Sequence, residues 1–334
     1  MSLIQKLIYG LNIIAVIALL FAYLSPYVNP NTTWFFSFFG LGYPILLFAN
    51  ILFLLFWLTT KPKYALLSII VIAVGYNSIF RTIGFNKPKK VTEGFSVLSF
   101  NIGGTSHHFS AKNKKIKIAE FKTLIRKQSP DIVCLQERKE FMIPILDGIF
   151  KGYKTHVDPE KKTCIYSKLP IIDHGIITFD TPYHSASWVD VNFQEKIYRI
   201  YGLHLSSNKV PNLVDNLNEI IDESVYVLDK YSIHAVKRVE QLEDIMKHAE
   251  TSPYPVLITG DFNDMPQSYT YKKISQDYCD AFINHGNGIG KTQKTNLPGL
   301  RIDYAFADDS IDILDHRIIS ADLSDHSPII TTIQ

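Results

Sequence analysis

The chain has 334 residues, of which 46% are hydrophobic, and its formal net charge is +2. This hydrophobic content excludes a disordered chain, and three cysteines are too few and odd in number for a disulfide scaffold. Residues 1–90 hold seven basic side chains and no acidic one, which leaves 27 basic against 32 acidic residues, a net charge of −5, in residues 91–334. The division predicts a membrane anchor at 1–90 and a folded domain at 91–334, and it argues against a basic nucleic-acid module.

Three apolar runs fill the first ninety residues, at 7–24, 34–58 and 64–80. A bilayer core takes about 20 apolar residues of helix, with a range of roughly 17 to 25, so we predict three transmembrane helices. A cleaved signal peptide is the alternative for the first run, but only one basic residue, Lys6, precedes it and two more apolar runs follow. A buried helix at the start of the folded domain is the alternative for the third run.

The basic residues of short loops predict the orientation. Lys61 and Lys63 lie in the turn between the second and third runs, while the loop at 25–33 carries no charge. Because basic short loops stay inside, we expect a multi-pass protein of the bacterial inner membrane with residues 91–334 outside the cytoplasm. Arg81 and the cluster at 87–90 oppose this orientation, since they would be an inside signal if the third run did not span.

From residue 95 onward the pattern changes to short strands with few helices. Alternating or buried apolar segments predict strands at 95–100, 131–137, 163–167, 171–179, 186–193, 196–205, 256–260, 302–307 and 311–318. Helical spacing predicts helices at 114–127 and 213–249. Many strands and few helices indicate an α/β domain of stacked sheets with helices outside.

Polar side chains stand at the ends of several of these strands. They are Asn101, Glu137, His204, Asp261, Asn263, Asp303, Asp325 and His326. Each alone is more often a turn residue or a hydrogen-bonded surface residue. Burial of any one without partners is costly, so their joint occurrence predicts a shared site.

Six short segments carry these residues in a fixed order. They are Leu98-Ser-Phe-Asn101, Cys134-Leu-Gln-Glu137, Gly202-Leu-His-Leu205, Thr259-Gly-Asp-Phe-Asn263, Arg301-Ile-Asp-Tyr304 and Ser324-Asp-His-Ser-Pro328. In this order they resemble the motifs of the endonuclease/exonuclease/phosphatase superfamily, over a stretch from Phe95 to the C-terminus. The resemblance implies two packed mixed β-sheets flanked by helices, a four-layer α/β sandwich, here preceded by a three-helix transmembrane anchor.

The same resemblance implies a divalent-metal-dependent phosphoesterase. Magnesium is the expected cofactor, with manganese as the alternative. Glu137 would be the principal metal ligand, with help from Asn101 and Asp325, a set suited to magnesium because that ion takes only one or two protein carboxylates and keeps waters.

The remaining residues receive catalytic roles from the resemblance. Asp261 would align or deprotonate the attacking water, and Asn263 would hold the phosphate or that carboxylate. His204 and His326 would contact phosphate oxygens, and Asp303 would orient His326 through a ring nitrogen.

The expected partners are the lipid bilayer and a phosphoester or pyrophosphate substrate, preferably lipid-linked, and no protein partner can be inferred. The net charge of −5 disfavours duplex binding. One alternative is a nuclease at the membrane, for which the basic patches at 112–117 and 161–162 could steer a strand. A second alternative is an inactive binding module, although all six motifs keep their polar members.

Three further features leave alternatives open. The stretch 206–233 is amphipathic, which favours a helix packed on the domain over a lid or lipid-facing element. Arg238 and Gln241 resemble a pair of the family but equally fit a solvated helix face. His107 and His108 could touch substrate or a second metal.

Overall fold

The structure is a computed structural model of the chain, and it describes residues 1–87, 91, 93–103, 114–157, 162–181, 183–207, 220–294 and 300–334, without the side chains of 114, 157 and 220–228. His107 and His108, and residues 112, 113 and 161 of the two basic patches, lie outside the described residues.

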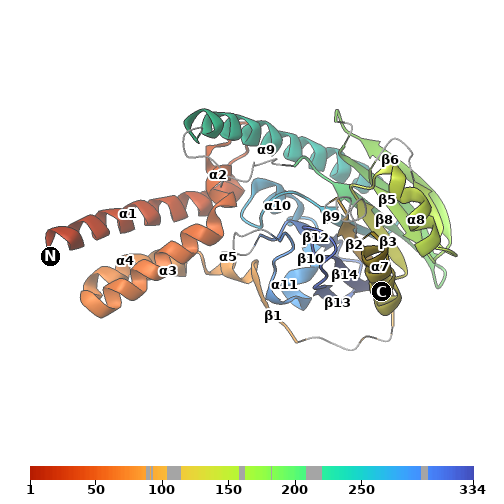
Figure 1. Ribbon diagram of the computed structural model, residues 1–334, viewed down its shortest axis with the longest axis horizontal. Helices are drawn as coiled ribbons and strands as arrows, with labels where there is room; N and C mark the ends of the chain where they lie inside the picture. The colour runs from red at the N-terminus through yellow and green to blue at the C-terminus, as the bar shows by residue number, and fades with distance from the viewer. Residues whose placement is uncertain are drawn as a thin grey trace.

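Two six-stranded mixed sheets form the centre of the domain that follows the first eighty residues (Figure 1). The first sheet has the order β13-β14-β2-β3-β5-β4, with strands at Ile313–Ile318, Ile329–Ile333, Phe95–Asn101, Ile132–Gln136, Cys164–Ser167 and Lys154–Val157. The second has the order β10-β12-β9-β8-β7-β6, with strands at Cys279–Asp280, Asp303–Ala307, Val256–Asp261, Lys196–His204, Ser185–Phe193 and Ile171–Thr178.

Each sheet contains one parallel pair, β2 with β3 and β8 with β9. In each pair the two strands end almost level, so that Asn101 lies opposite Gln136 and His204 lies opposite Asp261. Because parallel strands place their carboxyl ends at the same edge, the polar residues at those ends are collected at one edge of each sheet.

The domain is a four-layer sandwich, as the sequence predicts. One apolar cluster lies between the sheets and includes Val97, Ile200 and Leu257. A second covers the outer face of the first sheet under α7 (Lys114–Gln128), η3 (Glu140–Met142) and α8 (Ile143–Ile149), and a third covers the second sheet under α9 (Ile220–Glu250) and α10 (Tyr269–Ile274). Burial of both sheet faces explains why most of these strands read as continuous apolar runs.

The first eighty residues form an arm that projects from the domain (Figure 1). Its elements are α1 (Leu3–Leu24), η1 (Ser25–Tyr27), α2 (Phe35–Leu41), α3 (Tyr43–Thr60), η2 (Pro62–Tyr64), α4 (Ala65–Val74) and α5 (Tyr76–Phe80). The second predicted helix is therefore two helices that meet at Gly42, and the third is two that meet at Gly75. A Cβ at Gly75 would lie 2.0 Å from the Tyr23 ring, so only glycine lets α1 approach this closely.

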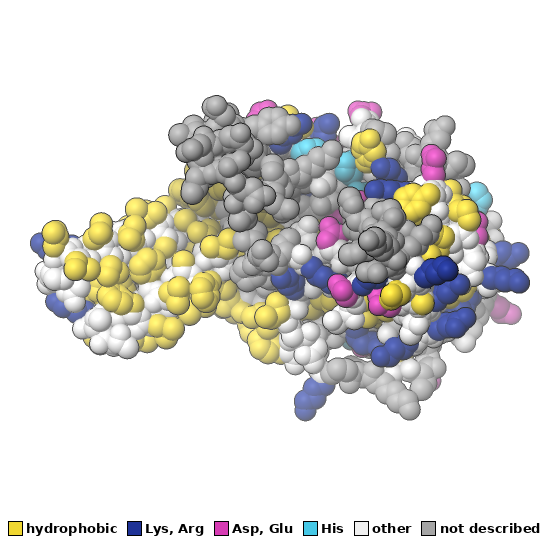
Figure 2. All heavy atoms as spheres, viewed as in Figure 1, with side chains coloured by type: hydrophobic (Ala, Val, Ile, Leu, Met, Phe, Trp, Pro, Cys, Tyr) yellow, Lys and Arg dark blue, Asp and Glu magenta, His cyan; other side chains and the backbone are white. Residues whose placement is uncertain are grey.

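Two helical segments of the arm, Leu3–Tyr27 and Tyr43–Thr60, are long and apolar enough to cross a membrane, and Pro62–Val74 is a shorter apolar helix. Most of their apolar side chains face outward, and Figure 2 shows the arm as a largely apolar surface. The sequence predicts three spanning helices, but only two segments of the described chain are long enough. The third apolar run is interrupted at Gly75, and its longer part is a short helix.

The three long helices of the arm are joined by buried polar groups. The Asn12 amide donates to the Ser68 hydroxyl over 3.0 Å, and its oxygen accepts from the Trp57 indole over 3.1 Å. Asn50 donates to the Ala15 carbonyl over 3.0 Å. Apolar helices in lipid gain little by burying apolar area against one another, so hydrogen bonds of this kind help to specify their packing.

The inner end of the arm packs against the domain. Leu41 contacts an apolar cluster of Met265, Leu300 and Ile302. The guanidinium of Arg301, 1% exposed, donates two hydrogen bonds of 3.1 and 2.6 Å to the Arg81 carbonyl just beyond α5. A two-stranded antiparallel ribbon completes this junction, with β1 at Ile83–Phe85 and β11 at Asn287–Ile289, next to α11 (Ala281–His285).

Several predicted boundaries shift. Helix α9 begins at Ile220, and 213–219 lie outside the described residues. Strand β12 begins at Asp303 and β13 at Ile313. The strands β1, β4, β10, β11 and β14 and the helices α8, α10 and α11 were not predicted, because each is eight residues or shorter and carries too little periodicity to be recognised.

Candidate active site

The site is organised around Asp261, which ends β9 and is 1% exposed. Its Oδ2 accepts a hydrogen bond of 2.9 Å from the Asn101 amide, at the end of β2 in the other sheet, and its Oδ1 accepts one of 2.9 Å from the Asn263 backbone N–H. A carboxylate buried this deeply needs such donors. Burial raises the pKa of Asp261; Asp303 raises it further, whereas His326 opposes the rise.

Glu137 lies beside this centre, in the turn directly after β3. Its Oε1 accepts a hydrogen bond of 3.1 Å from the same Asn101 amide, and its side chain is 40% exposed, so the carboxylate opens to solvent. The backbone φ of Glu137 is +57°, a left-handed conformation that costs such a residue on the order of 1 to 3 kcal/mol. Asn263 has φ +53°, which asparagine tolerates more easily. The bend at Glu137 accompanies the contact of its carboxylate with Asn101, and the bend at Asn263 accompanies the hydrogen bond of its backbone N–H to Asp261.

His204 ends β8 and faces both carboxylates. Its Nε2 lies 3.6 Å from Glu137 Oε1 and 3.6 Å from Asp261 Oδ2, while its Nδ1 lies 3.3 Å from the Tyr183 carbonyl. Within the described part of the chain the buried Nε2 has no hydrogen-bond partner. A buried ring nitrogen left without a partner is costly, so this atom marks a position where an external oxygen would be bound.

His326 and Asp303 form a buried pair on the other side of Asp261. His326 Nδ1 lies 3.0 Å from Asp303 Oδ2, and its Nε2 lies 3.8 Å from Asp261 Oδ2. Burial by itself would lower the pKa of His326, but the carboxylates of Asp303 and Asp261 outweigh it and raise the pKa to about 10. The imidazole in this structure is therefore cationic at neutral pH and offers a charged N–H at Nε2.

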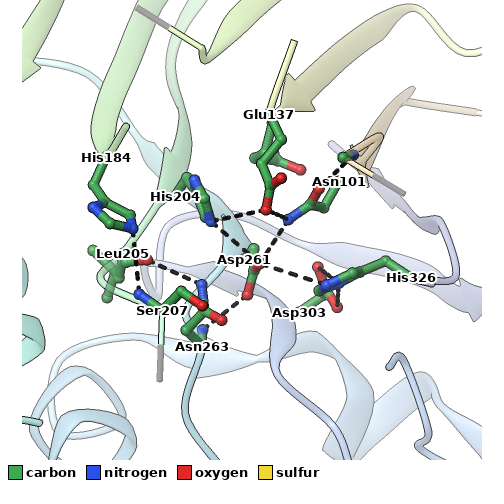
Figure 3. Close-up of polar contacts among 12 residues, drawn as sticks. Asn101, Glu137, His184, His204, Leu205, Ser207, Asp261, Asn263, Asp303 and His326 are labelled. Carbon is green, nitrogen blue, oxygen red and sulfur yellow. Dashed lines mark hydrogen bonds and ion pairs between the residues drawn. The ribbon is translucent and has the colours of Figure 1, made fainter. Parts of the chain in front are cut away.

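Figure 3 shows seven of the eight predicted site residues around this centre: Asn101, Glu137, His204, Asp261, Asn263, Asp303 and His326. The eighth, Asp325, is the chain neighbour of His326 and helps to raise the pKa of that residue. Its exposed carboxylate accepts a hydrogen bond of 3.0 Å from the Ser324 hydroxyl, and among the described residues no hydrogen bond or ion pair joins it to Glu137. Its part in a metal site stays a prediction.

The residues fit a hard divalent cation. Glu137 offers an accessible carboxylate, and Asn101 an amide oxygen that already accepts a hydrogen bond of 2.9 Å from Gly103 N–H. A Cβ at Gly103 would lie 2.0 Å from Glu137 Oε2, so glycine keeps the second carboxylate oxygen uncovered on that side. Oxygen ligands with few carboxylates are the set that magnesium prefers.

A second group of ligand atoms is also close together. Atoms of Asp261, Asp303 and His326 lie within 4.8 Å of one another, close enough to hold an ion. In this structure, however, His326 Nδ1 is within hydrogen-bonding distance of Asp303, and a metal there would have to displace the ring proton. The assignment of Asn101, Glu137 and Asp325 as metal ligands stays a prediction beside this second group.

Two residues that support the site were not assigned roles from the sequence. The Thr292 hydroxyl accepts hydrogen bonds from the backbone N–H groups of Ile302 and Asp303, at 3.0 and 3.1 Å. The Ser324 hydroxyl donates to the Asn101 carbonyl over 2.8 Å. Ser324 lies inside one of the six motifs, so its place near the site could have been inferred from the sequence. Nothing in the sequence around Thr292 indicates that its hydroxyl contacts the start of β12.

Arg238 and Gln241 are not on a solvated face. Arg238 is fully buried and donates to Asp264 over 3.1 Å and to the Ser206 carbonyl over 3.0 Å. Gln241 accepts from the Ser206 backbone N–H over 2.8 Å. Helix α9 thus holds the loops that follow His204 and Asn263. At the described end of the 206–233 stretch, Tyr231 is buried and donates to the Ser37 carbonyl over 2.7 Å, so that end is packed, as favoured.

Comparisons with known proteins identify the family of the chain. The model of the Endonuclease/Exonuclease/phosphatase family matches residues 98–326, and that of a Domain of unknown function (DUF8431) matches residues 5–82. No curated protein matches the chain.

Solved structures share the fold. An endonuclease/exonuclease/phosphatase family protein of Bacteroides thetaiotaomicron has a TM-score of 0.55 and 17% identity, covering 74% of this chain and 98% of its own. The mannosyl-6-phosphatase of the same species has a TM-score of 0.53 and 16% identity, covering 72% and 99%. The TDP2 protein of D. rerio, complexed with a single-strand DNA product, has a TM-score of 0.54 and 17% identity, covering 72% and 99%.

Replacing Glu137 with Gln is expected to lower phosphoesterase turnover by at least about 100-fold, because the amide keeps the side-chain shape but removes the charge that would hold the metal. Turnover and magnesium affinity would be measured on the full chain, with Glu140→Gln in the nearby η3 as the matched control. Turnover within about twofold of wild type at saturating magnesium would contradict the assignment.

Replacing Asp303 or His326 with Ala is expected to lower turnover by about 100- to 10,000-fold each, and the double variant by little more than the larger single loss. The reason is that Asp303 acts through the ring it holds. A double-mutant cycle measures the coupling, and the near-ultraviolet circular dichroism of each variant checks that it is folded. Losses that simply multiply would show that the two residues work independently.

Proposed function

Because the chain belongs to the endonuclease/exonuclease/phosphatase family, we propose that it is a membrane-anchored, divalent-metal-dependent phosphoesterase that hydrolyses a phosphoester or pyrophosphate bond of a lipid-linked substrate. The phosphoesterase part rests on the constellation around Asp261. The proposal that the substrate is linked to a lipid rests on one observation, which is that only a few residues separate these side chains from those that contact the apolar arm.

The contacts of the site support the roles that we propose for most of its residues. Glu137 and Asn101 would hold magnesium or manganese, with Asp325 as a further ligand, and the bound ion would stabilise negative charge on the phosphate and leaving group. Asp261 accepts the proton of the attacking water or aligns that water. The buried position of Asp261 between two donors keeps one carboxylate oxygen directed at the space bordered by His204 and His326.

The two histidines suit the phosphate oxygens. His204 Nε2 is buried and accepts or donates no hydrogen bond among the described residues, and His326 Nε2 is directed inward because Asp303 holds the opposite side of the ring. Asn263 fixes Asp261 through its backbone N–H, and its side-chain amide donates to the Leu205 carbonyl over 3.0 Å. These contacts favour the role in which Asn263 holds the carboxylate over direct phosphate binding.

The arm lies within a few residues of the catalytic groups. The loop after β9 runs from Asn263 to Met265, which packs with Leu41 of the arm, and then to Gln267, which donates to the Ser78 carbonyl over 3.2 Å. Asp303 lies two residues from Arg301, which binds the arm at Arg81. A catalytic centre connected so directly to apolar helices is suited to a phosphate held at the bilayer surface.

Hydrolysis of nucleic acid is the alternative within the same chemistry. The solved neighbour that holds a single-strand DNA product favours it, whereas the net charge of residues 91–334 opposes it. An inactive binding module is the third possibility, against which stand the seven assembled polar residues.

A substrate panel tests the proposal. We expect the full chain in lipid nanodiscs with magnesium to cleave a lipid-linked pyrophosphate or phospholipid phosphate at least about 10-fold faster than inositol phosphate, plasmid or single-stranded DNA, because membrane and enzyme would share one surface. Glu137→Gln serves as the inactive control. Preferential cleavage of DNA would replace the proposal with a nuclease, and no turnover of any substrate would favour a binding module.

The orientation can be tested separately. The N-terminal half of α1 packs beside the α3–α4 turn, with Tyr9 and Tyr64 ring centroids 4.9 Å apart, so Lys6, Lys61 and Lys63 gather at the end of the arm away from the domain (Figure 1). Because basic ends stay in the cytoplasm, alkaline phosphatase fused after Gln334 is expected to be active and a fluorescent protein that fails to mature after export to be dark. The reverse pattern would place the domain inside and favour cytosolic phosphoesters.

A further inference from the structure

Apolar side chains are exposed on the domain itself, beyond the arm. They form a ribbon patch of Phe80 on α5, Phe85 on β1, Ile283 on α11 and Ile289 on β11, with exposed fractions of 50, 68, 39 and 65%. The rings of Phe80 and Phe85 meet edge to face, with centroids 5.6 Å apart. Soluble surfaces carry isolated exposed apolar residues, but a contiguous group that includes two aromatic rings indicates an interaction surface.

The pairing of the ribbon places its apolar residues on one face. Ile83 lies opposite Ile289, and Phe85 lies opposite Asn287, while Gly84 and Gly288 alternate to the other face. Gly84 is buried and Phe85 is exposed, so β1 turns its glycine inward and its large apolar side chain outward, whereas all three residues of β11 are exposed. For β1 this is the reverse of the usual pattern for a strand packed on a domain and facing water.

The patch is held in a fixed position. Asn86 donates hydrogen bonds of 3.1 Å to the carbonyls of Ile283 and Gly286, and Gly290 N–H donates to the Thr82 carbonyl over 2.9 Å. Arg301, buried behind it, binds the Arg81 carbonyl. These hydrogen bonds hold the apolar side chains of the patch in their exposed positions.

The patch continues the apolar surface of the arm. Val74 at the end of α4 is 63% exposed and Tyr76 on α5 is 57% exposed, and the chain passes from there through Phe80 directly into β1. Figure 2 shows the apolar surface of the arm extending onto the edge of the domain where Figure 1 places α5 and β1. The described ribbon strands contain no charged residue, and the basic side chains of Arg81 and Lys87 flank β1.

We propose that the ribbon patch lies in the head-group and upper acyl region of the membrane that the arm enters, so that the domain rests on the bilayer through a second contact. This inference rests on the membrane insertion in the proposed function and adds which face of the domain meets the lipid. Helix α1, with 22 residues, is about 33 Å long, enough to cross the hydrocarbon core and bring its inner end to the interface. Aromatic rings and flanking basic groups suit that region.

Lipid fits the patch better than a protein partner does. The surface joins that of α4 and α5 without a break, so a protein bound to the patch would have to share the same edge with the lipid around the arm. A membrane contact also explains why the described strands of the ribbon lack the charged residues that otherwise protect exposed edges from pairing.

The test attaches an environment-sensitive fluorophore to single cysteines in the full chain, reconstituted into nanodiscs with and without shallow spin-labelled lipid. Cys134 and Cys164 are buried, so a Cys279→Ser background leaves the introduced thiol as the accessible one among the described residues. The test site is Ile289→Cys. The positive control is Leu52→Cys on α3, 50% exposed, and the negative control is Ile172→Cys on β6, 55% exposed at the far edge of the second sheet.

The proposal expects blue-shifted emission and strong quenching by the spin-labelled lipid at Ile289→Cys and Leu52→Cys, and neither at Ile172→Cys. Quenching at Leu52→Cys alone would overturn the patch while leaving the anchor intact. A blue shift at Ile289→Cys without quenching would identify a protein interface and overturn the lipid contact. Absence of quenching at all three sites would refute membrane insertion and, with it, both proposals.

Discussion

The burial of the Arg301 guanidinium links the two parts of the molecule. Its Nη2 lies 2.7 Å from Asp280 and donates to the Arg81 carbonyl over 2.6 Å, with the Phe282 and Tyr304 rings each 4.6 Å from its central carbon. A charge removed from water is tolerated only when such partners replace it. The position of the arm and the start of β12, which carries Asp303, are therefore fixed by the same side chain.

The catalytic centre depends on donors from both sheets meeting at one carboxylate. Asp261 is held by Asn101 from the first sheet and by Asn263 from its own, so the distance between the sheets sets the distance between Glu137 and His204. The left-handed backbone at Glu137 shows that this meeting is made at a conformational cost. A strained backbone conformation persists where the surrounding packing holds it in place. Here the parallel strand pairs β2–β3 and β8–β9 provide that packing.

Much of this arrangement could be predicted from the sequence, because strand ends and motif order both have local signals. Asn101, Glu137, His204 and Asp261 follow apolar segments that predict strands, and their joint occurrence in the order of the family motifs predicts a shared site. The contact of Arg301 with Arg81 could not be predicted, since it joins residues 220 positions apart through a backbone carbonyl that carries no residue identity. The break at Gly75 likewise depends on a Tyr23 ring in another helix, and a 17-residue apolar run contains no hint of it.

The apolar cluster of Leu41 with Met265, Leu300 and Ile302 has a consequence for how the chain unfolds. Since its members come from both parts, neither part can lose its structure without exposing apolar surface and the Arg301 charge of the other. Arm and domain should therefore melt together in one cooperative transition, and a fragment that starts near residue 92 would retain a guanidinium deprived of one of its acceptors. In this protein the apolar arm thus completes part of the buried interior of the domain.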